Sequence, residues 1–400
     1  MLEGLRVVEY ATYIAAPGCG GMLADWGADV IKVEPPGGDP IRKFFASIGR
    51  EAARNPVFDM DNRGKRSIVL DTASAAGKAA LQRLARDADV FLTNVRPAGL
   101  ARAGLDYESL AALNPKLVYA SVTGYGLEGP DVDRPGFDIT AFWARSGMAT
   151  LMAPKGTEPF LLRTGMGDHV TSMATAAGVL AALVERARTG KGRLVEASLL
   201  RAANYALASD MAITHAYGRV ASTRSRPENV QPLANFFRTG DGRWFVLNTR
   251  QGDADWAPLC RALGREDLIA DERFARAKGR SQNGPALVAI VDAALAQWTF
   301  EEMAARFDAE SLAWAPALTA VQAASDPQLI AAGGVVEIPQ HDGPPTKAPG
   351  SPLRFPGAED GPKGPPPRCG EHTRAVLSDA GYAAAEIDAL LASGAAREGA

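Results

Sequence analysis

The first 200 residues alternate between short apolar runs and segments with helical spacing. The apolar runs are nearly continuous, which is typical of strands buried on both faces of a sheet. Helical segments separate most of these runs, and this order favours parallel strands joined by crossover helices. The sequence therefore predicts an α/β fold with a parallel sheet. The predicted strands cover residues 5–11, 28–34, 67–71, 89–95, 116–124 and 194–200.

The pattern changes near residue 215, where a polar connector begins. A hairpin is expected around Asp241-Gly242, and short helical segments follow from about 253 to 325. This stretch predicts a separate, smaller α+β domain. A last strand is predicted at 335–339, an extended Pro- and Gly-rich segment at 343–368, and a helical tail at 372–392.

Charge and composition exclude several classes of function. A formal net charge of −3 and a pI of about 5.9 argue against a general nucleic-acid binder or a membrane-surface protein. The three cysteines and four histidines are scattered, so neither a disulfide framework nor a metal site is expected. The sequence has no apolar run of about 18 residues and no signal-peptide pattern, which predicts a cytoplasmic protein. It also has no GxxxxGK[ST], GxGxxG or GxSxG motif for a conventional nucleotide or hydrolase site.

Residues 166–188 form the clearest predicted helix, rich in small residues and almost free of charge until Glu185. A helix of this composition is expected to be buried nearly all round. Asp168 near its start has two interpretations. It could be an N-cap. It could instead be a nucleophile, because the helix N-terminus favours a carboxylate and its N–H groups could stabilise an oxyanion, while Gly165 and Gly167 would let a substrate approach closely.

A second polar cluster follows the predicted strand at 89–95. Ligands of open α/β sheets bind beyond the carboxyl ends of the strands. Arg96 and Arg102 could there hold phosphate, and Asn94 could pair with the edge of a heterocycle. The alternative is that both arginines are solvated charges at helix ends.

Seven motifs together resemble the family III CoA-transferases, which include formyl-CoA:oxalate CoA-transferase, carnitine CoA-transferase and the α-methylacyl-CoA racemases. The resemblance extends from about residue 3 to residue 392. The motifs are GADVIKVEPPGGDP (27–40), NRGKRSIVLD (62–71), Asn94 to Pro97 with Arg102-x-Gly104-Leu105, NPKLVYASVTGYG (114–126), Gly167-Asp168, TGKGR (189–193) and GEHT (370–373).

The resemblance implies a covalent mechanism. In this family the aspartate that matches Asp168 attacks the acyl-CoA donor, forms an acyl anhydride and then an aspartyl-CoA thioester, and passes CoA to an acceptor carboxylate. No metal or tightly bound organic cofactor takes part; CoA and acyl-CoA are substrates. The family's CoA contacts fall on Leu70, Asp71, Thr72, Ala73, Asn94, Val95, Arg96 and Arg102.

The resemblance also implies a fold and an assembly. A Rossmann-like large domain with a parallel sheet is built from both chain ends, residues 1–214 and 329–400. A smaller α+β domain covers residues 225–328. Two subunits interlock like rings to form a homodimer.

Two departures from the family narrow the reaction. Racemase members have a histidine that precedes the aspartate of a Gly-His-Asp motif, and here that stretch is Gly136-Phe137-Asp138. Phenylalanine cannot move a proton, and His169 does not replace it because neighbouring residues of a helix point about 100° apart. The glycine-run loop of the formyl-CoA enzyme is missing from residues 220–252, so oxalate and formate are not expected as substrates.

The predicted reaction is therefore CoA transfer from an acyl-CoA donor, with succinyl-CoA as one candidate, to an organic acid. Phe137, Asp138 and Gly167 are candidate substrate-orienting residues, although Asp138 could simply cap the helix that follows it. A racemase-like isomerase and a catalytically idle CoA-binding homologue are the competing interpretations.

Overall fold

The computed structural model describes residues 1–52, 54–250 and 252–399. The chain divides into two compact units, which are called the large unit and the small unit below. The large unit comprises Met1–Thr150, Phe160–Arg219 and Ile330–Ala400, and the small unit comprises Leu151–Pro159 and Val220–Leu329.

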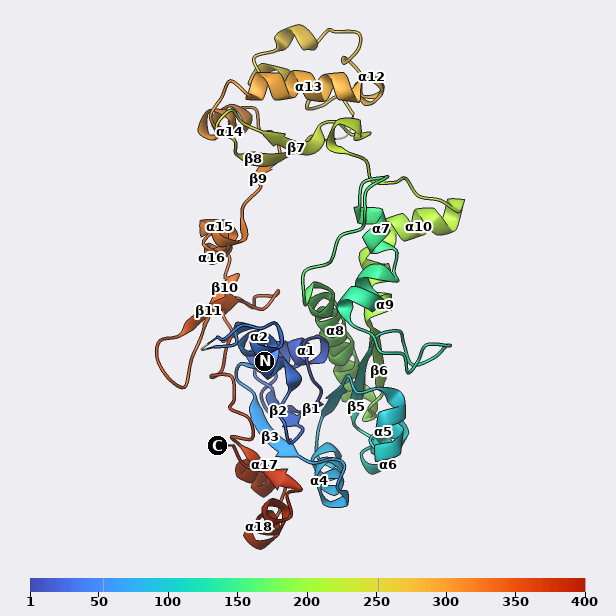
Figure 1. Ribbon diagram of the computed structural model, residues 1–400, viewed down its shortest axis with the longest axis vertical. Coiled ribbons are helices and arrows are strands. Elements are labelled where there is room, and N and C mark those ends of the chain that lie inside the picture. The colour runs from blue at the N-terminus through green and yellow to red at the C-terminus, as the bar shows by residue number, and fades with distance from the viewer. Residues whose placement is uncertain (53, 251, 400) are drawn as a thin grey trace. The chain divides into compact units, whose positions relative to one another are not determined.

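A seven-stranded sheet in the order β12-β3-β2-β1-β4-β5-β6 forms the centre of the large unit (Figure 1). Strands β1 to β6 are parallel, which confirms the six strands and the parallel α/β fold predicted from the sequence. Only β12 runs antiparallel, along the free edge of β3. The strands are β1 (Arg6–Tyr10), β2 (Asp29–Glu34), β3 (Arg66–Leu70), β4 (Val90–Thr93), β5 (Val118–Thr123), β6 (Leu194–Ser198) and β12 (Ala396–Arg397).

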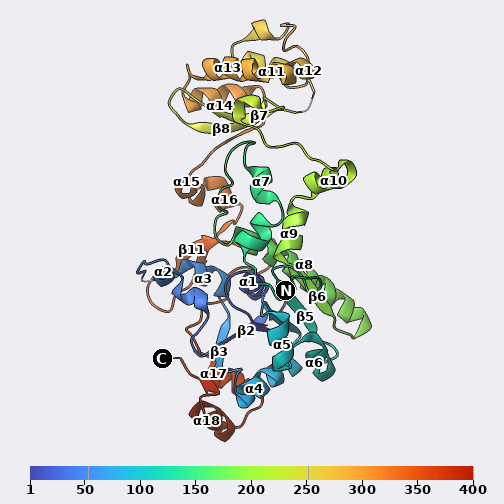
Figure 2. The same cartoon turned by 45° about the vertical axis from the view of Figure 1, so that its right-hand side comes forward.

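One face of this sheet packs on an apolar core. Val8, Ile31 and Phe91 on the strands meet the leucine and alanine faces of five helices, because alternate strand residues point to the same side. Figure 2 shows the C-terminal helices of this layer beside β3. The helices are α4 (Ala75–Arg86), α5 (Pro97–Ala103), α6 (Tyr107–Leu113), α17 (Thr373–Asp379) and α18 (Ala384–Ala392).

The opposite face carries buried charge beneath α1 (Ala15–Asp25). Glu9 of β1 accepts hydrogen bonds from Lys32 of β2 (3.1 Å) and from Lys65 (2.7 Å), and all three side chains are fully buried. Gly20 of α1 lies directly above, where an added Cβ would stand 2.0 Å from the Glu9 carboxylate. The glycines of α1 therefore allow close packing over this ionic layer.

Helix α8 (Met166–Thr189) packs against α1, β5 and β6. The sequence predicted that this helix is buried nearly all round, and that prediction is wrong. Met173 and Val184 are 41% and 63% exposed, and Ala177 and Ala181 between them are also exposed. These four residues form an apolar stripe on the side away from the sheet. Composition could not separate this arrangement from full burial, because the stripe is as apolar as the buried face. By length and composition α8 could cross a membrane, but core helices of soluble proteins share this property.

Two of the sequence motifs have structural roles in the large unit. In TGKGR, an added Cβ at Gly192 would lie 1.9 Å from the Leu117 carbonyl oxygen, so only glycine fits where the chain passes the start of β5. In GEHT, the Gly370 N–H donates to Ser67 Oγ (2.8 Å), and the His372 N–H donates to the Ser67 carbonyl (2.9 Å). These bonds fasten the C-terminal segment to β3.

The remaining elements of the large unit connect these layers. The antiparallel hairpin β10–β11 confirms the strand predicted at 335–339. The connecting elements are η1 (Pro40–Lys43), α2 (Phe44–Ser47), α3 (Pro56–Asn62), the π-helix η2 (Asp138–Ala144), α9 (Leu199–Ala206), α10 (Ala208–Tyr217), β10 (Val335–Ile338) and β11 (Thr346–Pro349); α7 (Met148–Met152) spans the boundary with the small unit.

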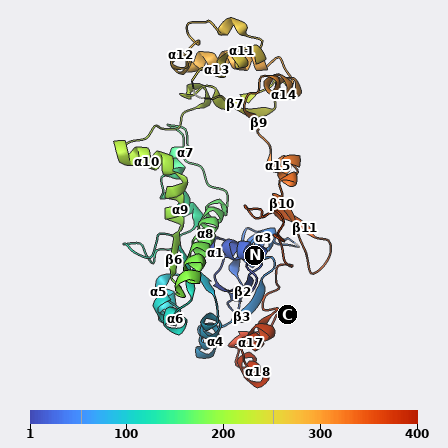
Figure 3. The ribbon, with the colours of Figure 1, turned by 180° about the vertical axis from the view of Figure 1, so that it is seen from behind.

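The small unit is an α+β fold with its own core of buried aromatic and aliphatic side chains, among them Phe237, Phe245 and Phe307. Its sheet has the order β7-β8-β9, with both pairs antiparallel, and the β7–β8 turn contains the predicted Asp241-Gly242. Figure 3 shows its helices gathered beside this sheet. Its elements are η3 (Arg226–Glu228), β7 (Ala234–Arg238), β8 (Trp244–Asn248), α11 (Trp256–Ala262), η4 (Glu266–Leu268), α12 (Ala277–Gln282), α13 (Gly284–Leu295), α14 (Phe300–Ala309), β9 (Trp314–Pro316) and α15 (Ala320–Ala324); α16 (Pro327–Ala331) spans the boundary with the large unit.

Candidate active site

A cavity of about 440 Å³ opens at the carboxyl ends of β1, β4 and β5. In an open parallel sheet, the point where the strand order reverses is the usual place for a ligand, and here that point lies between the adjacent strands β1 and β4. The cavity brings together Asn94, Val95, Arg96, Phe137 and Asp168, which the sequence placed among the candidate site residues. Tyr13 and Arg134 also line it, and the sequence gave no signal for either.

Asn94 organises the loop after β1. Its side-chain Oδ1 accepts the Thr12 N–H (3.0 Å), and its Nδ2 donates to the Thr12 carbonyl (2.6 Å). The amide therefore pairs with backbone rather than with the edge of a heterocycle. Contact between CoA and the Asn94–Arg96 segment stays a prediction.

Tyr13 has a left-handed backbone conformation, with φ of 64°. This conformation costs a non-glycine residue energy and needs support from its surroundings. The support is Asp39, whose Oδ1 accepts the Tyr13 N–H (3.1 Å) and whose Oδ2 lies 2.8 Å from Lys32 Nζ. The Tyr13 ring meets the Phe137 ring edge to face at 5.8 Å, so an aromatic pair forms one wall of the cavity.

Asp168 is the third residue of α8 and not its N-cap, so the capping interpretation is wrong. Gly165 is the N-cap, with φ of 83°, and its N–H donates to Asp138 Oδ2 (2.8 Å). Asp138 is also not a helix cap: its Oδ1 accepts the N–H of the next residue, Ile139, and its other oxygen binds the start of α8. The Asp168 carboxylate is thereby left without a capping role and lines the cavity.

The sequence suggested that Gly165 and Gly167 give a substrate access to the backbone, but the structure gives each glycine a different role. An added Cβ at Gly167 would lie 2.5 to 2.8 Å from atoms of Phe142, so the missing side chain makes room for that ring and not for a substrate. Gly165 provides the left-handed turn that starts the helix. Both glycines therefore shape the turn on which Asp168 is presented.

Burial, together with the nearby carboxylates Asp138 and Asp61, raises the pKa of Asp168 from 3.8 to about 7, and His169 partly opposes this rise. Removal from water disfavours the charged form of a carboxyl group, and a like charge adds to that effect. A carboxyl group that ionises near neutral pH and faces a cavity is a candidate for a chemical role.

His169 does not line this cavity and pairs instead with Asp61 of α3. Its Nε2 lies 3.1 Å from Asp61 Oδ1, and Asp61 is only 2% exposed. Burial alone lowers the pKa of His169, but the hydrogen bond and charge of Asp61 outweigh it and raise the pKa above 6.5. Two ionisable groups next to each other in the sequence are therefore held in different surroundings.

The other predicted CoA contacts do not line the cavity. Leu70, Asp71, Thr72 and Ala73 form the end of β3 and the loop before α4, and Thr72 Oγ1 is hydrogen-bonded to the hydroxyl of Tyr10 at the end of β1 (2.9 Å). Arg102 lies exposed in the last turn of α5.

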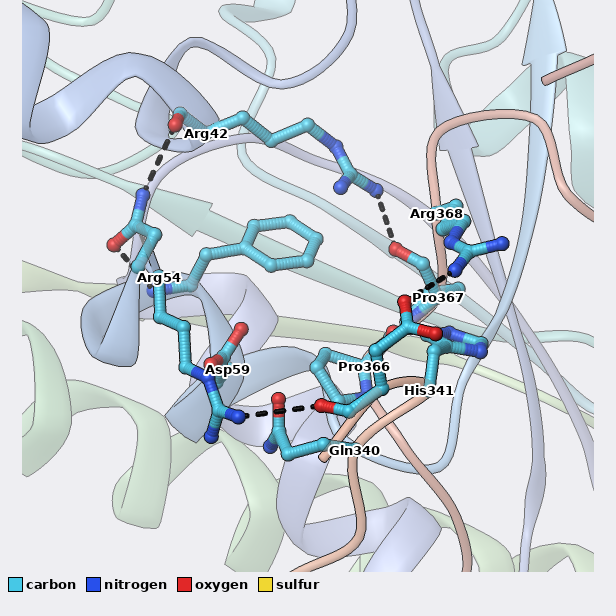
Figure 4. A pocket seen from close by; sticks show the side chains of 11 residues that line it. Arg42, Arg54, Asp59, Gln340, His341, Pro366, Pro367 and Arg368 are labelled. Atoms are coloured by element: carbon cyan, nitrogen blue, oxygen red, sulfur yellow. Dashed lines mark hydrogen bonds and ion pairs between the residues drawn. The ribbon is translucent and has the colours of Figure 1, made fainter. Parts of the chain in front are cut away.

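A second cavity, of about 320 Å³, lies between α3 and the C-terminal segment (Figure 4). Two of its arginines are ion-paired: Arg42 with Glu34 (2.6 Å), and Arg368 with Asp342 (2.8 Å). Arg42 also donates to the Pro367 carbonyl (3.0 Å), and Arg54 donates to the Asp342 carbonyl (3.2 Å). This cluster fastens the Pro- and Gly-rich segment to the body of the large unit.

Comparison with known proteins agrees with the geometry. A family model described as "CoA-transferase family III" matches residues 2–373. The chain is 34% identical to (R)-2-hydroxy-4-methylpentanoate CoA-transferase of Clostridioides difficile, over 96% of each chain. It is also 34% identical to cinnamoyl-CoA:phenyllactate CoA-transferase of Clostridium sporogenes, over 98% of this chain and 96% of the other.

A solved structure has the same fold. The crystal structure of a CAIB/BAIF family protein from Brucella suis superposes with a TM-score of 0.83 at 32% sequence identity. The match covers 95% of this chain and 99% of the other.

Proposed function

The chain belongs to the CoA-transferase family III, and on that premise we propose that it moves CoA from an acyl-CoA donor to an organic carboxylate through covalent intermediates on Asp168. The observation that supports this role for Asp168 is its position: a carboxylate on the first turn of α8, freed from capping and facing a cavity at the switch point of the sheet. A carboxylate suits this chemistry because the anhydride that it forms is reactive enough to pass an acyl group on.

The proposed reaction has four steps. The Asp168 carboxylate attacks the thioester carbonyl of the donor, which forms an acyl-aspartyl anhydride and releases CoA thiolate. The thiolate attacks the Asp168 carbonyl, which forms an aspartyl-CoA thioester and releases the donor acid. The acceptor carboxylate attacks that thioester, which forms a second anhydride and again frees the thiolate. The thiolate then attacks the acceptor acyl carbonyl, which gives the new acyl-CoA and restores Asp168.

The surroundings of Asp168 support these steps. The first turn of a helix has N–H groups without helical partners, which can stabilise the oxyanion of each carbonyl attack. Arg96 and Arg134 line the same cavity and provide positive charge for an anionic substrate. Leu70 to Ala73, Asn94 to Arg96 and Arg102 remain the proposed CoA contacts. No tightly bound cofactor is required.

The acceptor acid is best sought among acids with apolar side chains. Two relatives are named for 2-hydroxy-4-methylpentanoate and phenyllactate, and the Tyr13–Phe137 pair gives the cavity an aromatic wall. Succinyl-CoA remains one candidate donor. Phe137 stands where racemases have their histidine and cannot move a proton, which favours transfer over racemisation.

We also propose a cytoplasmic homodimer with domains at 1–214, 225–328 and 329–400, the last of which returns to the first. The apolar stripe of α8, at Met173, Ala177, Ala181 and Val184, is one surface that a second subunit could cover.

The direct test is mass spectrometry of the intact protein after incubation with a panel of acyl-CoA donors. Hydroxylamine trapping followed by peptide mapping is expected to place a modification on Asp168, and the donors that produce it define the substrate class. A parallel incubation in deuterated solvent tests the racemase alternative. Deuterium at the acyl α-carbon without any label on Asp168 would overturn the proposal.

The rate of transfer is expected to rise with pH through about 7. Asp168 must be ionised to attack, and burial together with Asp138 raises its pKa to about 7. Below that pH, kcat/KM should fall about tenfold per pH unit, because the ionised fraction falls tenfold. Measurement of kcat/KM from pH 5 to 9 checks this result.

Asp138→Asn provides the matched control for the pH profile. Removal of its negative charge is expected to move the acidic limb to lower pH. The single side-chain oxygen of asparagine can still accept the Gly165 N–H, but the Ile139 N–H then loses its acceptor. A wild-type profile that is flat between pH 5 and 8 would contradict this assignment of the ionising group.

A further inference from the structure

We propose that His169, held by Asp61, is a positioning residue that places a positive charge beside Asp168. This inference rests on the proposed role of Asp168 as the nucleophile and adds a residue that supports it. The function of the charge is to keep the Asp168 carboxylate ionised at neutral pH in a site that is otherwise unfavourable for it.

The imidazole, which is 43% exposed, is oriented by its contact with Asp61. His169 lies on the first turn of α8, next to Asp168, and its Nε2 lies 3.1 Å from Asp61 Oδ1. Asp61 stands on α3, which packs on α1, and α1 in turn packs on α8. The second oxygen of Asp61, Oδ2, is buried and has no hydrogen-bond partner among the described residues. A buried carboxylate needs a positive partner, so this arrangement favours the imidazolium form of His169.

The other cations close to Asp61 are already committed. Lys65 Nζ donates to Glu9 (2.7 Å), to the Pro17 carbonyl (2.9 Å) and to Asn62 (3.0 Å). Arg63 pairs with buried Asp25 at 2.6 Å. Among the described residues, His169 is therefore the group that balances Asp61.

The charges around Asp168 explain why a cation is needed there. Asp138 of η2 and Asp61 of α3 both disfavour a third negative charge, and burial acts in the same direction. His169 acts against them, and it can do so at neutral pH because Asp61 outweighs the effect of burial and raises the pKa of the imidazole. The dyad thus resembles an aspartate and histidine of a catalytic triad in form, but it acts through charge and not by proton transfer to substrate.

The test compares the pH profiles of His169→Gln and the wild type. Loss of the cation is expected to move the acidic limb of kcat/KM to higher pH by about one unit, the lower end of the effect of a nearby opposite charge. Transfer at pH 7 should then fall about fivefold and should recover at pH 9, because Asp168 is ionised there in both proteins. A purely structural role would lower the rate equally at all pH values.

His169→Lys is the matched variant, because it keeps a positive charge within reach of Asp61. Its acidic limb is expected to stay close to that of the wild type. If the glutamine and lysine variants shift alike, or if neither shifts, the proposed charge effect is wrong.

The histidine itself can be followed in the wild-type protein, in case the variants fold poorly. With 15N-labelled histidine, one of the four imidazole signals is expected to titrate above pH 6.5, and it should disappear in His169→Gln and move to lower pH in Asp61→Asn. A His169 signal that titrates below 6.5 in the wild type would overturn the inference.

Hydroxylamine trapping at pH 9 separates this inference from the proposed function. Label on Asp168 in both proteins, together with unchanged pH limbs, would leave the nucleophile in place and remove the role of His169. No label on Asp168 in the wild type would overturn both.

Discussion

Replacement of Asp168 by alanine is expected to reduce CoA transfer by at least about a thousandfold, because no other carboxylate among the described residues lines the central cavity. Steady-state assays with the donors that label the wild type measure this loss. Hydroxylamine trapping should find no modified peptide around residue 168. Retention of wild-type transfer by the alanine variant would revive the interpretation of the chain as a CoA-binding protein that uses no covalent intermediate.

Two further variants sharpen this experiment. Asp87→Asn changes an exposed aspartate that pairs with its neighbour Arg86 and should leave transfer unchanged. Asp168→Asn keeps the size of the side chain, and it should be assayed when freshly prepared because slow deamidation would restore the aspartate.

The asparagine variant should also be more stable than the wild type at alkaline pH. The pKa of Asp168 is raised to about 7 in the folded protein, so the unfolded chain loses this proton at lower pH than the folded protein does. Ionisation of Asp168 therefore destabilises the fold increasingly from about pH 4 to pH 7, and by a constant amount above pH 7. With about 1.4 kcal/mol per pKa unit, the gain at pH 8 is up to about 4 kcal/mol. Denaturation at pH 4 and pH 8 measures the difference, which should be close to zero at pH 4.

The largest loss of stability is expected from Glu9→Gln. This change leaves Lys32 and Lys65 buried without the carboxylate that joins them, at distances of 3.1 and 2.7 Å. Removal of one partner of a buried ion pair costs about 3–5 kcal/mol, so the free energy of unfolding measured in urea should fall by that amount. Glu301→Gln is the surface control: it breaks an exposed pair with Arg243 and should cost less than about 1 kcal/mol.

The double variant Glu9→Gln/Lys65→Met identifies the cause of the loss. It removes the charge of Lys65, which loses its carboxylate partner in Glu9→Gln, whereas Lys32 still pairs with Asp39 (2.8 Å), so it should be more stable than Glu9→Gln alone. A double variant that is less stable than the single one would mean that the packing of Glu9, and not its charge, dominates. Burial alone would raise the pKa of Glu9, but Lys65 and Lys32 lower it below 4.5, so its stabilisation is present above that pH and is lost as the pH falls through the lowered value.

The sequence was sufficient for the parallel sheet because the strands of β1 to β6 are short, continuous apolar runs with helices between them. It was not sufficient to predict the partners of the charged residues within these strands. Glu9 and Lys32 interrupt two of these runs, and only the packing of α1 shows that they pair with each other and with Lys65. Strand β12 has two residues, which is too few for any periodic signal.

The site shows the same division between local and tertiary information. The position of Asp168 near a helix start was readable from Gly-Met-Gly-Asp. Its release from capping depends on Asp138, which binds the N–H of Gly165 and lies 27 residues before Gly165 in the sequence. The Asp61–His169 pair joins residues 108 positions apart. Asp61 immediately precedes the motif at 62–71, yet nothing local distinguishes it from an ordinary solvated aspartate. Tyr13 adopts a backbone conformation that its residue type disfavours, so sequence preference pointed away from it.

Strand β12, the one antiparallel strand of the seven-stranded sheet, bears on the order in which that sheet is completed during synthesis. Strands β1 to β6 are complete once Ser198 has been synthesised, whereas β12 begins at Ala396, about 200 residues later. At about 5–20 residues per second, the ribosome needs roughly 10–40 seconds for that interval. During this time the edge of β3 has unpaired backbone groups, which are a template for association with another chain. The newborn protein therefore has a period of vulnerability to aggregation that closes only when its final strand arrives, and a chaperone that shields a sheet edge would act in that period.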